Sequence, residues 1–353
     1  MSFKITEYSA AYEADYNRLM TESPVGMFNH SLPYRAFLQS ILPGTENHYF
    51  CAFDDDELVA ALPVFVKTGI YGAVVNSLPF YGSHGGIIYR QGTEPRVFMS
   101  LLETLAELCN RLDAFSCTLI ESPLDKQTES YSHFSANLFD SRIGQITSLP
   151  LKDGDGSLDD RLLTMCHQKT RNMIRKGLRG GFEVSHDGSM ATLQVLHAIH
   201  EGNIKSIGGQ PKPLDVFRAI AENFEYNKDY RIYLAIKNGL IAAALLLFYF
   251  KDTVEYFTPA TLESYRSDQP MSLLIYSAMK DAIIERDARN WNWGGTWISQ
   301  SGVYQFKSRW GTKDYPYRYH IKTNPALHIL NVSKNELFES YPYFYSLPFS
   351  IFD

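Results

Sequence analysis

Residues 302–312, GVYQFKSRWGT, contain the two side chains with the clearest chemical potential, Lys307 and Arg309. Apolar Phe306 and Trp310 alternate with them, which is the period-two pattern of a β-strand with one apolar face. The pattern predicts that both cations point away from that face, side by side. A compact ammonium beside a forked guanidinium suits a diphosphate. The alternative is an edge strand whose charged face lies in solvent.

A second group of cations occupies a segment without a single acidic residue. If this segment is helical, Arg171 and Arg175 lie one turn apart on the same face, where unpaired like charges repel by roughly a few tenths of a kcal/mol. A bound phosphate would relieve this repulsion. We therefore expect Arg171, Arg175 and Lys176 to hold a substrate phosphate together with the first pair; the alternative is a solvated face that pairs with acids elsewhere. The full group is Arg161, Lys169, Arg171, Arg175, Lys176 and Arg179.

Residues 77–89, SLPFYGSHGGIIY, combine several glycines with a single histidine, His84. Glycine lets main-chain N–H groups approach a ligand closely, and a histidine that titrates near neutral pH can take a proton from an attacking amine. His84 is therefore the candidate general base, and Tyr81 is a candidate lining residue beside it. The alternative is a histidine that only holds the loop by hydrogen bonds. Three more aromatic residues are predicted to line the same cleft: Tyr256, Trp293 and Tyr304.

His197, His200 and Glu201 have the spacing of metal ligands on one helical face. Their sequence, LHAIHEG, is not the HExxH pattern, and no further ligand cluster accompanies it. We therefore interpret these histidines as structural and expect no metal. The cysteines show no CxxC spacing, which predicts buried reduced thiols; they are Cys51, Cys109, Cys117 and Cys166.

The bulk properties argue against some classes of partner. The chain has 353 residues and a formal net charge of −6, so it lacks the overall positive field that binds nucleic acid non-specifically. No apolar run near the start resembles a signal-peptide core. The longest apolar run, residues 240–250, has about half the length of a bilayer-spanning helix. These features predict a soluble, cytoplasmic protein.

The order of elements repeats along the chain. Two apolar strands around a polar turn occur twice, and in each case an apolar helical stretch and a short strand follow. The second turn contains Asn238 and Gly239, whose tolerance of positive φ makes the pair a strong hairpin signal. The strand pairs are residues 49–66 and 231–248, and the helical stretches start at Met99 and Met271.

The join between the two repeats is LPLKDGDGSLDD, residues 149–160, whose glycines and aspartates are typical of a linker. We therefore expect two domains, 1–150 and 151–353. The aromatic tail at residues 341–352 is expected to pack on the second domain, because it lacks the basic companions of a membrane-binding segment.

The repeated unit resembles the acetyltransferase-like (GNAT) fold, and its tandem arrangement resembles the FemAB-like family, in particular its exopolysaccharide-associated relatives. Three stretches carry the resemblance. Residues 77–89 are similar to a Ser-Leu-Pro-Phe plus Gly-Gly segment, residues 169–184 to a basic helix before a strand, and residues 302–312 to a Phe-Lys-x-x-aromatic-Gly motif. The resemblance implies an α/β fold of two tandem GNAT-like domains, each a mixed twisted sheet flanked by helices.

The resemblance also implies an acyltransferase that moves an aminoacyl or other acyl group onto an amine of a cell-wall (peptidoglycan) or polysaccharide precursor. No cofactor would be bound permanently, and the acyl donor would be aminoacyl-tRNA or acyl-CoA as co-substrate. The acceptor would be a phosphorylated or nucleotide-linked sugar or peptidoglycan precursor.

Two alternatives stay open. One is an acyl-CoA-dependent N-acyltransferase that acts on a nucleotide sugar, and the other is a non-catalytic carbohydrate-binding or partner-binding module. Residues 266–271, RSDQPM, count against CoA, because they lack the glycines of a pyrophosphate cradle and Pro270 has no N–H to donate.

Overall fold

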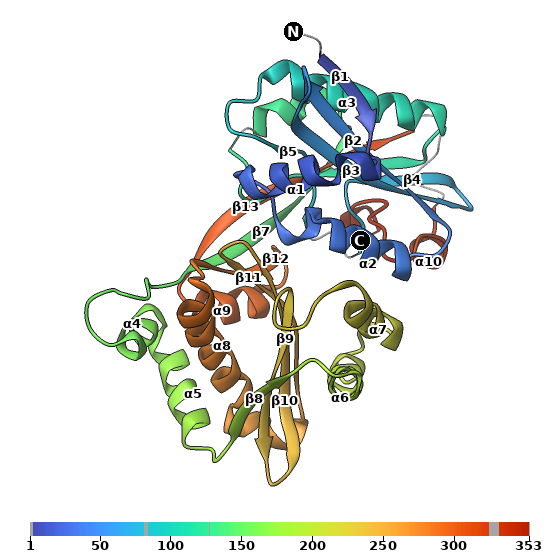
Figure 1. The fold of residues 1–353 in the computed structure, drawn as a ribbon. Coiled ribbons are helices and arrows are strands. Elements are labelled where there is room, and N and C mark those ends of the chain that lie inside the picture. Colours follow the sequence, from blue (N-terminus) through green and yellow to red (C-terminus); the bar gives the residue numbers. More distant parts are fainter. Residues whose placement is uncertain (1–2, 81–83, 127, 325–331, 353) are drawn as a thin grey trace. The chain divides into compact units, whose positions relative to one another are not determined.

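The computed structural model describes residues 3–80, 84–126, 128–324 and 332–352 (Figure 1). The chain divides into two compact units: unit 1 contains residues 1–143 and 315–353, and unit 2 contains residues 144–314. This division differs from the expected one, since residues 315–353 belong to unit 1 and not to the second domain. The reason is that β13 (Thr312–Thr323) pairs with β6 (Ser116–Ile120).

Unit 1 is built on a mixed sheet in the order β1-β2-β3-β4-β6-β13-β7, with β5 beside β3. β1 to β4 pair antiparallel in sequence order, whereas β4 and β6 run parallel. The remaining elements are β1 (Phe3–Glu7), α1 (Glu13–Glu22), α2 (Leu32–Ile41), β2 (Thr45–Asp54), β3 (Glu57–Gly69), β4 (Gly72–Asn76), β5 (Ile88–Tyr89), α3 (Pro95–Arg111), β7 (Leu138–Ser148) and α10 (Lys334–Ser340).

Alternate residues of the unit 1 strands face two different helical layers, as the pleat requires. Phe50 and Ala52 of β2 lie in one hydrophobic core with Leu101 of α3. Tyr49 points the other way and packs against Tyr16 of α1, with ring centroids 5.9 Å apart. Helix α3 buries residues three and four apart, which gives it the apolar stripe that the sequence predicts.

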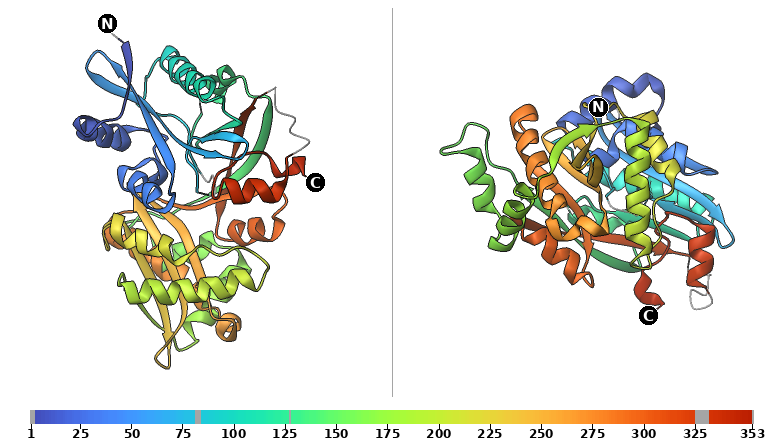
Figure 2. Two further views of the ribbon diagram at one scale, coloured as in Figure 1. Left: turned by 90° about the vertical axis from the view of Figure 1, so that its right-hand side faces the viewer. Right: turned by 90° about the horizontal axis from the view of Figure 1, so that it is seen from below.

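Unit 2 contains the strand order β12-β11-β10-β9-β8. Helices α5 and α8 lie on one side of these strands, and α6 and α7 lie together on the other (Figures 1 and 2). The elements are α4 (Leu158–Met165), α5 (Gln168–Leu178), β8 (Glu183–Asp187), α6 (Met190–Lys205), α7 (Leu214–Asn223), β9 (Tyr230–Lys237), β10 (Leu240–Phe250), β11 (Thr253–Thr261), α8 (Pro270–Arg286), β12 (Asn290–Trp297) and α9 (Ser301–Ser308).

The internal repeat predicted from the sequence is confirmed in the order of elements. β2 and β3 form an antiparallel hairpin, as do β9 and β10, whose turn residues Asn238 and Gly239 have φ values of 53° and 74°. In each unit a third strand, a long helix and a parallel strand follow: β4, α3 and β6 in unit 1, and β11, α8 and β12 in unit 2. Both units therefore have the same α/β plan.

The segment GVYQFKSRWGT is not the predicted strand. Residues 301–308 form helix α9, and Gly311, with a φ of 75°, precedes β13. The period-two pattern was ambiguous, because Phe306 and Trp310 are also four residues apart and share one face of a helix. Phe306 of α9 and the fully buried Trp310, two residues after the helix, both pack in the core of unit 2.

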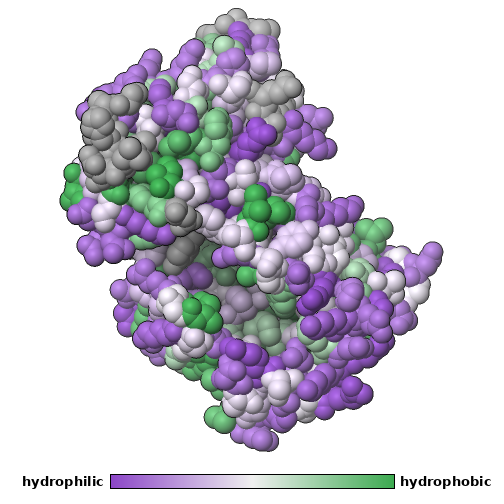
Figure 3. All heavy atoms as spheres, turned by 180° about the vertical axis from the view of Figure 1, so that it is seen from behind, coloured by the Kyte–Doolittle hydropathy of each residue, from purple (hydrophilic) through white to green (hydrophobic). Residues whose placement is uncertain are grey.

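The exposed apolar side chains of the described residues are scattered. No helix in the described ranges is long and apolar enough to cross a membrane. The face shown in Figure 3 is mostly hydrophilic, with hydrophobic residues in small separate groups. The most exposed large apolar side chains of the described residues, Ile70, Ile207 and Ile298, come from three different loops. Scattered exposure of this kind is normal for a protein surface.

Candidate functional site

Two parallel strands of unit 2, β11 and β12, pair over a short stretch and then separate. Beyond Glu255, β11 stays paired with β10 as far as Thr261 but no longer pairs with β12. The β10 pairing shifts register so that Phe257 is an extra residue in β11, a bulge of the kind that bends a strand. We call this place, where the two strands no longer pair, the unit 2 strand gap. The paired residues before it are Thr253, Val254 and Glu255 with Asn290, Trp291 and Asn292.

A buried carboxyl stands at the start of the unit 2 strand gap. Glu255 is 8% exposed, and its pairing partner Asn292 donates a hydrogen bond from Nδ2 to Glu255 Oε2 at 2.7 Å. Asn292 Oδ1 in turn accepts from the Gly294 N–H at 2.9 Å. Burial raises the pKa of Glu255 to about 8, against a smaller lowering by the Asn292 hydrogen bond. Glu255 is therefore mostly protonated at neutral pH.

Lys307 of α9 is held by β12 rather than presented to solvent. Its Nζ donates to the carbonyl oxygens of Gly294 and Gly295, each at 3.3 Å, and to Thr296 Oγ1 at 2.8 Å. These contacts use all three hydrogens of an ammonium group. The side chain is 7% exposed, and burial lowers its pKa to about 8. This corrects the predicted role, because no ammonium hydrogen is left for a phosphate.

One chain of hydrogen bonds joins the two buried groups. It runs from Glu255 through the Asn292 amide to the Gly294 peptide, whose carbonyl accepts from Lys307. Both end groups titrate near pH 8. A carboxyl that changes protonation near neutral pH can act as a general acid or base, so this cluster is the part of unit 2 best suited to proton transfer. The sequence analysis missed Glu255 and Asn292.

The predicted aromatic lining residues of unit 2 serve partly as core. Tyr256 and Trp293 pack together with ring centroids 4.9 Å apart, and Trp293 is 2% exposed. Trp293 Nε1 donates to Thr147 Oγ1 at 2.9 Å, which fixes the ring. Tyr304 is half-buried on α9 and donates from its hydroxyl to Asp314 at 2.8 Å. Of these three, Tyr256 and Tyr304 keep some exposed surface and stay candidates for substrate contact.

The cations predicted to hold a phosphate fall into two groups. Arg171 donates to the Cys166 carbonyl at 2.7 Å and so supports the start of α5. Arg175 and Lys176 of α5 are exposed, and Arg309 at the end of α9 is half-buried. Within the described part of the chain, these last three side chains form no ion pair or hydrogen bond. They are therefore available to an anionic ligand, whereas Arg171 is engaged.

The start of α8 is the place where a GNAT domain would bind a pyrophosphate, and it lacks part of the usual anion-binding groups. Pro270 at the first helical position has no N–H. Helix α5 approaches so closely that a Cβ at Gly177 would lie 2.8 Å from the Gln269 carbonyl oxygen. The nearby cation Arg266 is already paired with Glu263 at 2.7 Å. The start of α8 therefore offers an anion one main-chain donor fewer than usual, and the cation Arg266 beside it is paired.

His84 belongs to unit 1, where it is 3% exposed and lies against Tyr317 with ring centroids 5.6 Å apart. The glycines after it have a structural reason. A Cβ at Gly85 would lie 1.9 Å from the Ser77 carbonyl oxygen, and Gly86 has a φ of 87° close to the Ile120 carbonyl. The role of His84 as a base stays a prediction. Tyr81, the predicted neighbour in the lining, lies outside the described residues.

Unit 1 has an equivalent strand gap, which its own C-terminal tail fills. β4 and β6 pair from Val74 to Asn76 and then separate, and Asn76 is fully buried. Tyr345 of the tail donates from its N–H to Asn76 Oδ1 at 2.7 Å, and its carbonyl accepts from Asn76 Nδ2 at 2.8 Å and from Thr118 Oγ1 at 3.1 Å. The tail therefore packs on unit 1, not on the second domain as expected from the sequence.

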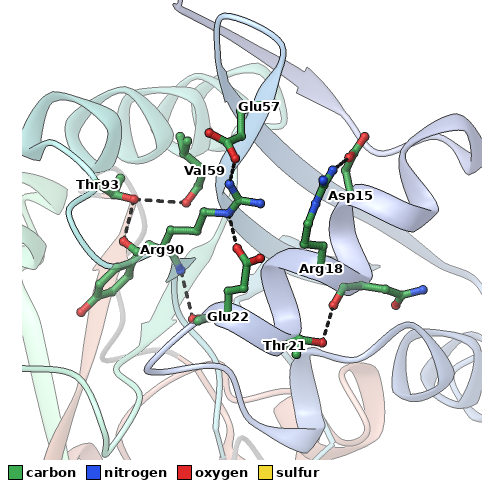
Figure 4. Close-up of polar contacts among 11 residues, drawn as sticks. Asp15, Arg18, Thr21, Glu22, Glu57, Val59, Arg90 and Thr93 are labelled. Atoms are coloured by element: carbon green, nitrogen blue, oxygen red, sulfur yellow. Dashed lines mark hydrogen bonds and ion pairs between the residues drawn. The ribbon is translucent and has the colours of Figure 1, made fainter.

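The start of α3 in unit 1 lies among several acidic side chains. A surface pocket of about 320 Å³ there is lined in part by Asp54, Glu57 and Glu94. Arg90 lies between two carboxylates, with its Nε 2.9 Å from Glu22 and a second contact to Glu57 (Figure 4). Its charge is thus already neutralised. The acids make this helix start unfavourable for a phosphate, in spite of the helix dipole.

The histidines with metal-like spacing have separate structural contacts. His200 is 4% exposed, and its Nε2 accepts from the Lys212 N–H at 3.2 Å. Burial lowers the pKa of His200 to about 4, so the ring is neutral. Glu201 instead pairs with Lys205 one turn along α6, at 2.8 Å. The described residues contain no group of three or more histidine, cysteine, aspartate or glutamate side chains that could hold a metal ion.

The comparisons with known proteins agree with this architecture. Residues 166–308 match the family described as an acetyltransferase (GNAT) domain. Among solved structures, FemX is similar with a TM-score of 0.69 at 14% identity, covering 95% of this chain and 99% of that one. A tandem GNAT protein from the clavulanic acid biosynthesis pathway has a TM-score of 0.57 at 12% identity, covering 92% and 100%.

A third similar structure is the C-terminal domain of a putative lysylphosphatidylglycerol synthetase from Agrobacterium fabrum. It has a TM-score of 0.54 at 13% identity, covering 93% of this chain and 96% of that one. A search of curated proteins found no match.

The fold and the matched domain define the class of protein as an acyltransferase with a GNAT domain in unit 2. The two repeated units give the chain a tandem GNAT-like fold, similar to the folds of FemX and of the tandem GNAT protein.

Proposed function

We propose that this protein transfers an aminoacyl or other acyl group onto an amine of a cell-wall or polysaccharide precursor, and that the transfer takes place at the unit 2 strand gap. The observation that carries the proposal is the gap itself. It lies within the matched GNAT domain, and a buried titratable carboxyl stands where β11 and β12 separate. Sites of this kind are typical of proton transfer.

The chemistry needs little from the protein beyond placement. An unprotonated amine attacks the carbonyl carbon of an ester or thioester, a C–N bond forms, and the donor leaves as an alcohol or thiol. No covalent enzyme intermediate is required. The protein would supply proximity and stabilisation of the developing oxyanion. Arg309, Arg175 and Lys176 would hold a phosphate of the phosphorylated or nucleotide-linked acceptor, because they are the predicted cations left without a partner.

For the donor we favour an aminoacyl ester such as aminoacyl-tRNA over acyl-CoA. This preference is supported by Pro270 at the first position of α8, which has no N–H to donate to a pyrophosphate. Acyl-CoA remains the second candidate, since it is the co-substrate of GNAT acetyltransferases and residues 166–308 match that domain. We also propose that His84 and Tyr81 of unit 1 contact the substrate. The support for this part of the proposal is the sequence pattern of residues 77–89.

The test is a matrix of donors and acceptors with mass-spectrometric detection of product. The purified protein is incubated with aminoacyl-tRNA or with acyl-CoA of several chain lengths, and with nucleotide-linked muramyl peptides or amino sugars. We expect an amide product with an aminoacyl ester. A product with acyl-CoA alone would overturn the preferred donor. No product in any combination, with a folded protein, would overturn the proposed function.

The phosphate-binding cations can be tested against a matched control. Arg175→Gln with Lys176→Gln removes two exposed, unpaired charges from α5. Arg218→Gln with Lys228→Gln removes two exposed charges that are paired with acids in the same unit. We expect the first double variant to raise KM about tenfold and the second to leave it unchanged. Equal effects would show that the α5 cations act only through net charge.

A further inference from the structure

The segment that fills the unit 1 strand gap, residues 343–347, is bound through its main chain. We call it the tail segment. Asn76 of β4 contacts both the N–H and the carbonyl of Tyr345, and Thr118 of β6 donates to the same carbonyl. The carbonyl of Tyr343 accepts from the Phe80 N–H at 2.8 Å. The tail segment therefore contacts both separated strands and also the chain that follows β4.

The chain that follows β4 has an unusual conformation where it meets the tail segment. Leu78 has a φ of 120° and Phe80 a φ of 67°, although neither is a glycine. Positive φ values are costly for residues with bulky side chains, and they persist only where the surrounding structure holds them. Both side chains are buried. Residues 77–80 are thus held in this conformation by their contacts and not by their local preference.

Strand β6 holds the first of these residues. The Ser77 N–H donates to the Thr118 carbonyl at 2.9 Å, and Ser77 Oγ accepts from the Ile120 N–H at 2.8 Å. These two hydrogen bonds continue the contact between β4 and β6 by one residue beyond their paired stretch. The start of residues 77–80 is therefore fixed by the sheet itself.

The tail segment holds the last of these residues. Besides the hydrogen bond between their main chains, the rings of Phe80 and Tyr343 lie 5.5 Å apart, and the Phe80 ring also packs edge-to-face against Phe37 of α2. Tyr343 itself has a positive φ of 68°. Because its carbonyl follows this torsion in the chain, a different φ would move the carbonyl away from the Phe80 N–H.

The return of the loop rests on the same residues. Gly85 lies so close to the Ser77 carbonyl oxygen that a Cβ would be 1.9 Å from it, and Gly86 lies beside the Ile120 carbonyl. His84 precedes these glycines and is buried against Tyr317. The place of His84 thus depends on residues 77–80, which in turn depend on the tail segment.

We propose that the tail segment is a positioning strap. It holds residues 77–80 in their positive-φ conformation and thereby fixes the place of His84, and its release from the unit 1 strand gap frees both. In unit 1 the opening between β4 and β6 serves as the seat of this strap. The proposal does not depend on acyl transfer, so it can be tested before any substrate is known.

The experiment compares two substitutions of one residue, Tyr343→Gly and Tyr343→Pro. Both remove the ring, but glycine allows a φ of 68° and proline fixes φ near about −65°. The readouts are the amide hydrogen exchange of residues 77–80 and the rate at which diethyl pyrocarbonate modifies His84, both followed by mass spectrometry. In Tyr343→Pro both rates should rise about tenfold or more, whereas in Tyr343→Gly they should stay within about threefold of the wild type. The β2–β3 hairpin should exchange as in the wild type.

Two outcomes of this comparison would overturn the proposal. Unchanged rates in Tyr343→Pro would show that the tail segment does not hold the loop. Equal increases in both variants would show that only the ring matters, and not the main chain of the strap.

If Tyr343→Pro also opened the β2–β3 hairpin, hydrogen exchange of the wild type at low denaturant concentrations would decide. A strap predicts that residues 77–80 and 343–347 open in a single step, with the same dependence on denaturant and before the hairpin opens. Two separate openings would contradict it.

Discussion

Replacing Lys307 by methionine tests whether the buried amine supports β12. Methionine keeps most of the length of the chain but removes the donor of three hydrogen bonds, to Gly294, Gly295 and Thr296. Leaving these acceptors without a partner costs about 1–3 kcal/mol each where they stay dry. Removal of a desolvated charge offsets part of this loss at neutral pH. The loss of the hydrogen bonds and the removal of the buried charge are therefore better separated by measuring the free energy of unfolding over a range of pH than at a single pH.

The sign follows from the pKa of the folded state. Lys307 titrates at about 8 when folded and at 10.5 when unfolded, so between these values the unfolded chain binds more protons. Wild-type stability should therefore rise with pH across this window. At about 1.4 kcal/mol per pKa unit, the rise is about 3 kcal/mol. Below pH 8 both states carry the proton and the slope disappears.

The assay is denaturant unfolding from pH 7 to pH 10.5, followed by the fluorescence of the buried tryptophans of unit 2, Trp291, Trp293 and Trp310. We expect the free energy of unfolding of Lys307→Met to rise about 3 kcal/mol less than that of the wild type between pH 8 and pH 10.5, while the contribution of Lys212, whose pKa is also lowered to about 8, stays. Lys205→Met, which removes an exposed lysine paired within α6, is the matched control and should keep the full rise. If Lys307→Met and wild type showed the same slope, the burial argument would be refuted.

Three further predictions test other parts of the structure. Gly85→Ala would place a Cβ 1.9 Å from a main-chain carbonyl oxygen and should destabilise unit 1 by more than about 3 kcal/mol in thermal melts. The control is Gly202→Ala on α6, where a Cβ meets open space. It should leave stability unchanged or raise it by up to about 1 kcal/mol. Asn76→Leu removes both amide hydrogen bonds to Tyr345 and should expose the tail to limited proteolysis; an unchanged cleavage rate would contradict its anchoring role. The pKa of Glu255 is about 8 in the folded chain and 4.5 in the unfolded chain, so the folded chain binds more protons between these two pH values. The contribution of Glu255 to wild-type stability should therefore fall as the pH rises from 4.5 to 8. Denaturant titrations of Glu255→Gln should lack this contribution.

The local signals in the sequence were sufficient for the regular elements of the fold. The Asn238-Gly239 turn specifies its hairpin because both residues accept positive φ, and the apolar stripe of α3 follows from residues three and four apart. The repeat then followed from the order of these elements. Each of these features is decided by residues close together in the chain, which is why sequence reasoning recovered them.

The misassigned parts depend on tertiary partners. Lys307 was predicted to point away from an apolar strand face because it alternates with Phe306 and Trp310, and only the carbonyls of β12 reveal its true environment. Glu255 sits between Val254 and Tyr256 on β11, a position that from sequence resembles the solvent side of a strand. Its burial comes from residues far away in the chain, so no local pattern identifies it as a site residue.

The two units share one plan but differ at the place where the plan leaves an opening. In unit 1 the amide of Asn76 is saturated by both the N–H and the carbonyl of Tyr345, so a ligand could bind there only by displacing the tail. In unit 2 the equivalent Glu255 keeps one oxygen free. The two repeated units therefore differ at the last residue paired across their parallel strands, where unit 1 has an amide bound to the tail and unit 2 has a carboxyl.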